Sequence, residues 1–172
     1  MAEKIVNVIV GIFGSLTTIP FIKEIIVFII SMCPILELRG GLIAASLLNM
    51  DPVISYIICL IGNVLPIPFI LWLITKILNW MRNSKFEKIK GIANWLDKKV
   101  EKNKGQIEKY GYLGLVLFVG IPLPGTGAWT GCLIASVLEM DKKKSFLAAV
   151  VGVFIASIIM MLLSFGILSN II

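Results

Sequence analysis

Two apolar runs in this chain are long enough to cross a lipid bilayer, and the remaining apolar segments are shorter. The long runs extend over residues 53–78 and 145–168. A helix needs about 20 residues to span the hydrocarbon core, whereas apolar runs of about 10–14 residues are typical of re-entrant or interfacial segments. The short segments form two pairs, 21–33 with 35–48 and 112–121 with 128–138, and each pair meets at a turn containing proline. This pattern predicts two spanning helices and two re-entrant helical hairpins.

The composition also favours a bilayer as the solvent. Of the 172 residues, 58% are hydrophobic and 15% are charged, whereas about a quarter of the residues in a soluble domain are charged. We therefore expect an all-α polytopic membrane protein that forms a single membrane domain over residues 1–172. Residues 1–20 carry no small-residue cleavage site, so we expect a retained segment that spans the membrane or lies on it.

The inventory of reactive side chains argues against an enzyme. The chain has no histidine, which removes imidazole bases and imidazole metal ligands. Its three cysteines, Cys33, Cys59 and Cys132, are scattered in apolar segments without metal-ligand spacing, so we expect them to be buried and reduced. We predict no catalytic centre, no cofactor and no metal site.

A basic segment, residues 79–111, separates the two halves of the chain. It holds nine Lys/Arg and four Asp/Glu. Apolar side chains recur in it at helical spacing, at Phe86, Ile89, Ala93, Leu96 and Val100. This pattern predicts a basic amphipathic linker helix on the membrane surface, or alternatively a solvated linker helix. Because membrane segments bracket it closely, we do not expect it to bind nucleic acid.

The two halves are related by an internal repeat. A shift of 90 residues aligns Pro34–Gly62 with Pro124–Gly152 without a gap, with nine identities over 29 positions. The repeats extend over residues 21–78 and 112–172. The positive-inside rule places the basic segment in the cytoplasm, so Asp51 and Asp141, although equivalent, should lie on opposite faces of the membrane. The sequence thus predicts inverted repeats, which are typical of secondary transporters with binding sites at the bilayer midplane.

The first hairpin carries two ionisable residues at membrane depth. Glu37 and Arg39 stand in "ELRGG", followed by Gly40 and Gly41. Charged side chains inside a membrane segment are costly unless paired or hydrated, which makes them candidates for function. We expect Arg39 to bind substrate and Glu37 to carry a proton; the alternative is an ion pair that stabilises the hairpin. The glycines could contact a ligand or allow close helix packing.

The second hairpin has an uncharged tip, "PLPGTG", followed by "AWTG". Thr126, Gly127, Trp129 and Thr130 are its candidate substrate contacts, because free backbone amides and hydroxyls can hold an anionic group. Hairpin geometry and helix packing are the alternatives for the glycine and prolines, and Trp129 could equally anchor the hairpin. In the first span, "GNVLPIP" at 62–68 predicts a kink, which would either open a cavity or serve packing.

The stretches "ELRGGLIAA" at 37–45 and "IPLPGTGAWTG" at 121–131 resemble the prokaryotic small multidrug export protein family. More distantly, the layout is similar to that of the DedA superfamily, whose members pair re-entrant hairpins with spanning helices. The resemblance implies transport, and in some DedA-type proteins the cargo is undecaprenyl phosphate or another phospholipid. This sequence departs from the DedA-type layout in one respect. Glu37 and Arg39 both lie in the first hairpin, and the position of the second hairpin that is equivalent to Arg39 is Trp129.

Together these features predict a transporter in the cell inner (cytoplasmic) membrane, crossing it several times. The expected substrate is an amphipathic anion such as a lipid phosphate, because the guanidinium of Arg39 matches phosphate geometry. Two alternatives are an exporter of lipophilic drugs and a membrane scaffold that moves nothing. Beyond the substrate and membrane lipids, we expect a second copy as partner, forming a homodimer or larger oligomer, because so few helices shield the polar tips from lipid.

Overall fold

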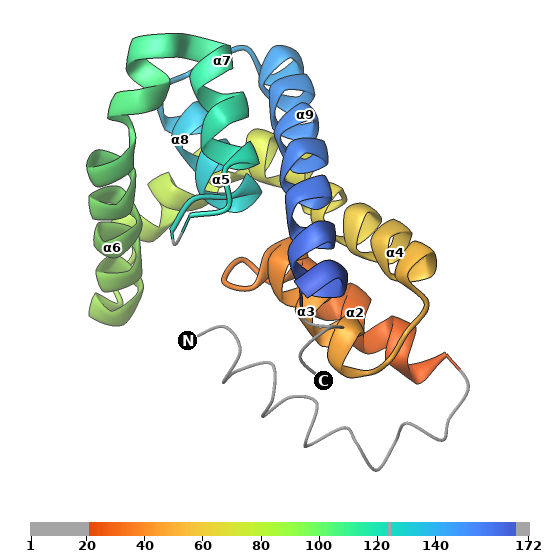
Figure 1. Cartoon of the computed structure of the whole chain (residues 1–172). Coiled ribbons are helices and arrows are strands. Elements are labelled where there is room, and N and C mark those ends of the chain that lie inside the picture. The colour runs from red at the N-terminus through yellow and green to blue at the C-terminus, as the bar shows by residue number, and fades with distance from the viewer. Residues whose placement is uncertain (1–20, 124, 168–172) are drawn as a thin grey trace. The chain divides into compact units, whose positions relative to one another are not determined.

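The computed structural model of the chain describes residues 21–123 and 125–167, and every regular element within these ranges is helical (Figure 1). This confirms the predicted all-α class. The predicted segment 1–20, Pro124 and the last residue of the predicted span 145–168 lie outside the described residues. The elements are α2 (Ile22–Met32), α3 (Glu37–Leu47), α4 (Pro52–Val64), α5 (Pro66–Arg82), α6 (Glu87–Asn103), α7 (Gly105–Gly120), α8 (Ala128–Val137), α9 (Lys142–Met161) and the π-helical η2 (Leu162–Ile167).

The helices form two compact units. Unit 1 ends at Leu65 and is completed by the chain from Val153 onward; unit 2 is Pro66–Gly152. In unit 1, α2, α3 and α4 pack against one another and η2 contacts α3. In unit 2, α8 packs on α5, α6 and α7, and α6 also contacts α5 and α7. The two predicted hairpins thus belong to different units.

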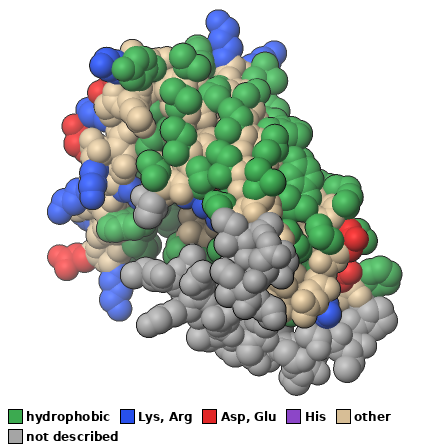
Figure 2. Space-filling model, in the orientation of Figure 1, with side chains coloured by type: hydrophobic (Ala, Val, Ile, Leu, Met, Phe, Trp, Pro, Cys, Tyr) green, Lys and Arg blue, Asp and Glu red, His purple; other side chains and the backbone are tan. Residues whose placement is uncertain are grey.

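Two helical stretches are long and apolar enough to cross a membrane. They are Pro52–Arg82, which combines α4 and α5, and Lys142–Phe165. Both coincide with the predicted spans. Large apolar side chains are exposed along them, as expected where lipid replaces water; on the first stretch these are Val53, Ile54, Ile57, Ile61, Leu65, Phe69, Trp72, Leu73, Ile77 and Trp80. Figure 2 shows hydrophobic side chains covering much of the viewed face.

Proline and glycine set the ends of the first hairpin's helices as expected. Helix α2 ends at Met32, and the next residue, Cys33, is extended with ψ 133°, because a residue before proline avoids the helical region. Helix α3 then begins at Glu37. In the second hairpin, α7 contains a non-helical bend at Gly111 with φ 58°, so its membrane half starts near the predicted residue 112.

The turns that follow α3 and α8 have the same backbone structure. Asn49 and Glu139 both take a left-handed conformation, with φ 50° and φ 53°. The next N–H, of Met50 or Met140, donates to a carbonyl five residues earlier at 3.0 Å in each turn. This pair of features is a Schellman-type helix end. The sequence repeat around the two turns therefore corresponds to a repeated local structure.

The basic segment differs in one respect from the predicted amphipathic helix 79–111. Helix α5 continues to Arg82, and the separate helix α6 begins at Glu87. Ala93 and Val100 of the predicted apolar stripe are buried, and α6 contacts α5, α7 and α8. Ala93 and Val100 therefore pack on protein, because α5 and α8 offer them an apolar surface, whereas Phe86 of the same stripe stays exposed.

Three large apolar side chains on or beside α6 are exposed, and one of them, Phe86, belongs to the predicted stripe. They are Phe86 just before the helix, Ile92, and Trp95, of which Trp95 is 57% exposed. Lysine and arginine side chains gather at the edge of the molecule that carries α6 (Figure 2). Aromatic residues beside lysines are typical of the membrane–water interface, so these exposed side chains are the ones that suit a bilayer surface.

Candidate functional site

Glu37 is a buried carboxylic acid at the start of α3. Its side chain is 6% exposed, and its backbone N–H donates to the Cys33 carbonyl oxygen at 2.9 Å, which closes the turn between α2 and α3. An acidic side chain in the first helical turn is favoured by the positive end of the helix dipole. The hairpin turn thus places this carboxylate inside unit 1.

Glu37 also has an unusual backbone. Its φ is 51°, a left-handed conformation that costs a non-glycine residue about 1–2 kcal/mol. Asparagine or glycine would adopt it more easily. A strained residue whose side chain is both buried and ionisable is a reason to look for function at that position.

Arg39 lies two residues beyond Glu37 and is half-buried. The Glu37 carboxylate and the Arg39 guanidinium interact electrostatically. Residues two apart do not face each other on a regular helix. Because Glu37 has a left-handed backbone conformation, it does not follow regular helical geometry. The rule that residues two apart do not face each other therefore does not apply to Glu37 and Arg39. The predicted proton carrier and the predicted anion anchor therefore form one charged cluster.

Gly40 and Gly41 serve close packing in the structure. A Cβ atom on Gly41 would overlap the Ser31 hydroxyl of α2 and lie 2.8 Å from Cys59 Sγ of α4. A Cβ on Gly40 would lie 2.6 Å from Leu36 Cβ. This matches the packing alternative for these glycines. That either one contacts a substrate stays a prediction.

In the second hairpin, the Thr126 hydroxyl organises the loop. Its Oγ1 lies 2.9 Å from the Ile121 carbonyl oxygen and 2.8 Å from that of Leu123, and the Leu123 N–H approaches it at 3.3 Å. Gly125 and Gly127 have φ values of 89° and 140°, which only glycine adopts without strain. Thr126 thus has a structural role besides the predicted substrate contact.

Trp129 and Thr130 lie in the first turn of α8. Trp129 is half-buried, whereas Thr130 is 4% exposed. The structure brings Thr126, Gly127, Trp129 and Thr130 together in unit 2 and Glu37, Arg39, Gly40 and Gly41 together in unit 1. A joint substrate site formed by both groups stays a prediction.

Asn63 lies in the stretch where the sequence predicts a kink. It is 3% exposed, and its Oδ1 atom has no hydrogen-bond partner among the described residues. Pro66 begins α5 directly after Leu65, so the proline ring interrupts the backbone hydrogen bonding between α4 and α5. A buried amide oxygen without a partner is costly, which adds Asn63 to the polar groups of interest in unit 1.

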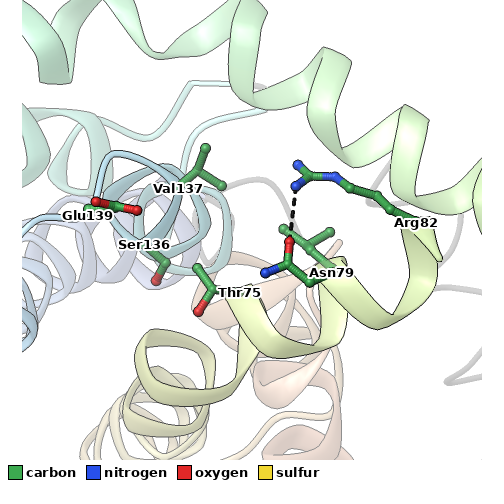
Figure 3. Close-up of a pocket in the computed structure, with 7 residues that line it drawn as sticks. Thr75, Asn79, Arg82, Ser136, Val137 and Glu139 are labelled. Carbon is green, nitrogen blue, oxygen red and sulfur yellow. Dashed lines mark hydrogen bonds between the residues drawn. The ribbon is translucent and has the colours of Figure 1, made fainter.

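A polar hollow between α5 and α8 was not predicted from the sequence. It has a volume of about 160 Å³, and its lining includes Thr75, Asn79, Arg82, Ser136 and Glu139 (Figure 3). The first three recur at i, i+4 and i+7, so they share one face of α5. The spacing is visible in the sequence, but it falls where an apolar span passes into the basic segment, where polar residues are expected in any case.

Comparison with known proteins identifies one relationship. A family model described as "Putative small multi-drug export protein" matches residues 37–159, well over half of the chain. No curated protein and no solved structure matches the chain. The family resemblance inferred from "ELRGGLIAA" and "IPLPGTGAWTG" is thereby confirmed. The more distant similarity to the DedA superfamily is not among these matches and stays a prediction.

Proposed function

This chain belongs to the family of small multi-drug export proteins, and from that premise we propose that it is a multi-pass transporter of the cytoplasmic membrane. Its two long apolar helices and their exposed apolar side chains make it a membrane protein. Soluble proteins rarely expose a contiguous apolar surface of this extent. We propose further that α2–α3 and α7–α8 are re-entrant hairpins of an inverted repeat.

One observation supports transport over a scaffold most directly. Glu37 is buried and strained, and it interacts with Arg39 at the start of α3. In a scaffold, an ionisable pair at membrane depth could serve only to hold the hairpin together, although each charge is costly there. A transporter uses such a pair, because substrate and proton can compete for it.

We propose an amphipathic anion, such as a lipid phosphate, as the substrate. Arg39 would hold the anionic group, since a guanidinium donates two parallel hydrogen bonds to phosphate. Glu37 would bind a proton when the anion leaves and release it when the anion binds, which couples transport to protons. The family description favours a second candidate, a lipophilic drug, for which Glu37 would be the counter-ion.

Transport by the purified protein in liposomes tests these proposals. Two fluorescent probes are compared, a short-chain lipid phosphate and a lipophilic cation. With an anionic substrate, Arg39→Ala should lower transport of the phosphate at least tenfold, and Arg39→Lys should retain part of it because the charge stays while the fork geometry is lost. Variants must first match the wild type in folded yield.

The results with the two probes distinguish anion transport, drug export and a scaffold role. Faster movement of the cation, unaffected by Arg39→Ala, would exclude the anionic substrate and favour drug export. If neither probe moves through the wild type, the transport proposal fails and the scaffold alternative gains support. We also propose that the unit of function is a homodimer, which would be excluded by a strictly monomeric mass in both mild detergent and nanodiscs.

A further inference from the structure

Glu139 occupies a backbone position that suits glutamate poorly. It follows the last turn of α8 with φ 53°, a conformation that asparagine and glycine adopt more readily than glutamate. The equivalent residue of the first repeat, in the same kind of turn, is Asn49 with φ 50°. The left-handed backbone conformation alone would favour asparagine at both positions. It therefore does not explain why residue 139 is a glutamate.

Glu139 is an exposed residue that belongs to the lining of the polar hollow between α5 and α8 (Figure 3). Among residues 21–123 and 125–167, no lysine or arginine lies within ion-pair distance of it. The other charged group of the lining, Arg82, is already engaged: its guanidinium donates through Nε and Nη2 to Asp97, and through Nη1 to Asn79 Oδ1 at 3.3 Å. With Arg82 balanced by Asp97, the hollow is left with one negative charge.

Polar groups without partners complete the lining. Ser136 is 8% exposed, and its Oγ has no hydrogen-bond partner within the described part of the chain. Its equivalent in the first repeat, Ser46, donates to the Ser164 carbonyl oxygen at 2.9 Å. Asn79 accepts from Arg82 through its oxygen, so its amide nitrogen remains to donate. Figure 3 shows the hydroxyls of Thr75 and Ser136 near each other, on α5 and α8, while the Asn79 oxygen is directed to Arg82.

The size of the hollow limits what can bind. Its volume of about 160 Å³ corresponds to about five water molecules at roughly 30 Å³ each. Pockets for drug-sized ligands are about 300–1,000 Å³. The occupant is therefore a small polar group. Because the unbalanced charge is negative and the last carbonyls of α8 add partial negative charge, this group is a cation.

We infer that this hollow is a binding site for a small N–H-bearing ammonium group, with Glu139 as counter-ion and Ser136 and Thr75 as hydrogen-bond acceptors. Ethanolamine, free or as the headgroup of a lipid, has this chemistry. An exposed ion pair alone contributes little, so the hydroxyls must share in binding, and we expect affinity in the millimolar range. The inference does not depend on the proposed transport.

Thermal unfolding of the full chain in an uncharged detergent tests the site. Ethanolammonium chloride should raise the Tm of the wild type more than sodium chloride at the same ionic strength, since a ligand that binds the folded state stabilises it. Tetramethylammonium chloride, which has no N–H donor, should behave like sodium chloride. An equal effect of ethanolammonium and sodium, or of the two organic cations, would overturn the inference.

The decisive variant is Glu139→Asn. It introduces the residue that the first repeat has in the same turn, so the fold should tolerate it, while the apparent dissociation constant for ethanolammonium should rise about tenfold, the loss of one charged hydrogen bond. Ser136→Ala should weaken binding several-fold and leave basal stability unchanged or higher. Glu87→Gln, which removes an exposed carboxylate elsewhere, is the matched control. Unchanged binding in Glu139→Asn would refute the site.

Nanodiscs distinguish the two sources of the ammonium group. If a lipid headgroup fills the hollow, free ethanolammonium should not raise the Tm any further in discs that contain phosphatidylethanolamine. In these discs Glu139→Asn should not respond to ethanolammonium either. If the natural ligand is a free compound, the effect should persist in phosphatidylethanolamine as it does in phosphatidylcholine.

Discussion

Gly62 and Gly152, which are 90 residues apart, take the same place against the hairpin that precedes each of them. A Cβ atom on Gly62 would lie 3.0 Å from the carbonyl oxygen of Phe28 in α2, and one on Gly152 would lie 2.9 Å from the carbonyl oxygen of Val116 in α7. In both units the absent side chain lets the long apolar helix that follows the hairpin approach the backbone of a hairpin helix. Such close contact between small residues is a main source of helix association in membranes.

Alanine at either glycine should destabilise the protein. Gly62→Ala and Gly152→Ala force a methyl group against backbone atoms that cannot move freely, so each should lower the free energy of unfolding by about 1–3 kcal/mol. Gly91→Ala is the control: it lies in α6, and a Cβ there meets nothing within 4 Å, so alanine should stabilise by up to about 1 kcal/mol. Unfolding in detergent measures all three, and equal tolerance at 62, 91 and 152 would contradict the packing argument.

The two repeated turns provide a test of membrane orientation. Met50 and Met140 follow the equivalent left-handed residues, and inverted repeats require them to lie on opposite sides of the membrane. Single cysteines at these positions, on a background in which Cys33, Cys59 and Cys132 are alanine, should react with an impermeant reagent from opposite sides. Position 140 should be cytoplasmic, together with residues 79–111. Labelling of both positions from the same side would exclude an inverted repeat.

The Thr126 hydroxyl should stabilise the tip of the second hairpin. Thr126→Val keeps the shape but removes the hydrogen bonds to the backbone of residues 121 and 123, so it should cost about 1 kcal/mol and increase hydrogen exchange in the loop. Thr126→Ser keeps the hydroxyl and should behave like the wild type. A stable Thr126→Val variant that loses only transport would instead indicate direct contact with the substrate.

The helices and hairpins could be predicted because proline, glycine and the length of apolar runs report directly on local structure. Pro34 separates α2 from α3, and Gly111 bends α7 close to the predicted start of the second hairpin. The register within the second hairpin could not be predicted in the same way. Gly62 meets Phe28 whereas Gly152 meets Val116, a shift of 88 rather than 90, because the tip between α7 and α8, residues 121–127, is longer than the tip between α2 and α3, residues 33–36.

Interactions between distant segments were beyond sequence reasoning. The apolar stripe of α6 fits a membrane surface or a protein surface equally well, and only the presence of α5 and α8 decides that Ala93 and Val100 pack on protein. Glu139 and Asn79 are 60 residues apart, so their meeting in one hollow had no local signal. A charge in an apolar run marks Glu37 as a candidate in the sequence, but nothing in the sequence predicts its left-handed backbone.

Removing the titratable group at position 37 should uncouple transport from pH. Glu37→Gln keeps the size and much of the hydrogen-bonding capacity of the buried side chain, but an amide does not titrate. If Glu37 carries the proton, this variant should still bind substrate while its transport rate no longer changes with pH, whereas Arg39→Ala should lose binding at every pH because a guanidinium stays charged. Glu87→Gln, outside the membrane segments, is the control for loss of a carboxylate. Binding and uptake in liposomes from about pH 5 to 8 measure both quantities. A Glu37→Gln protein with wild-type stability and a wild-type pH profile would show that another group carries the proton.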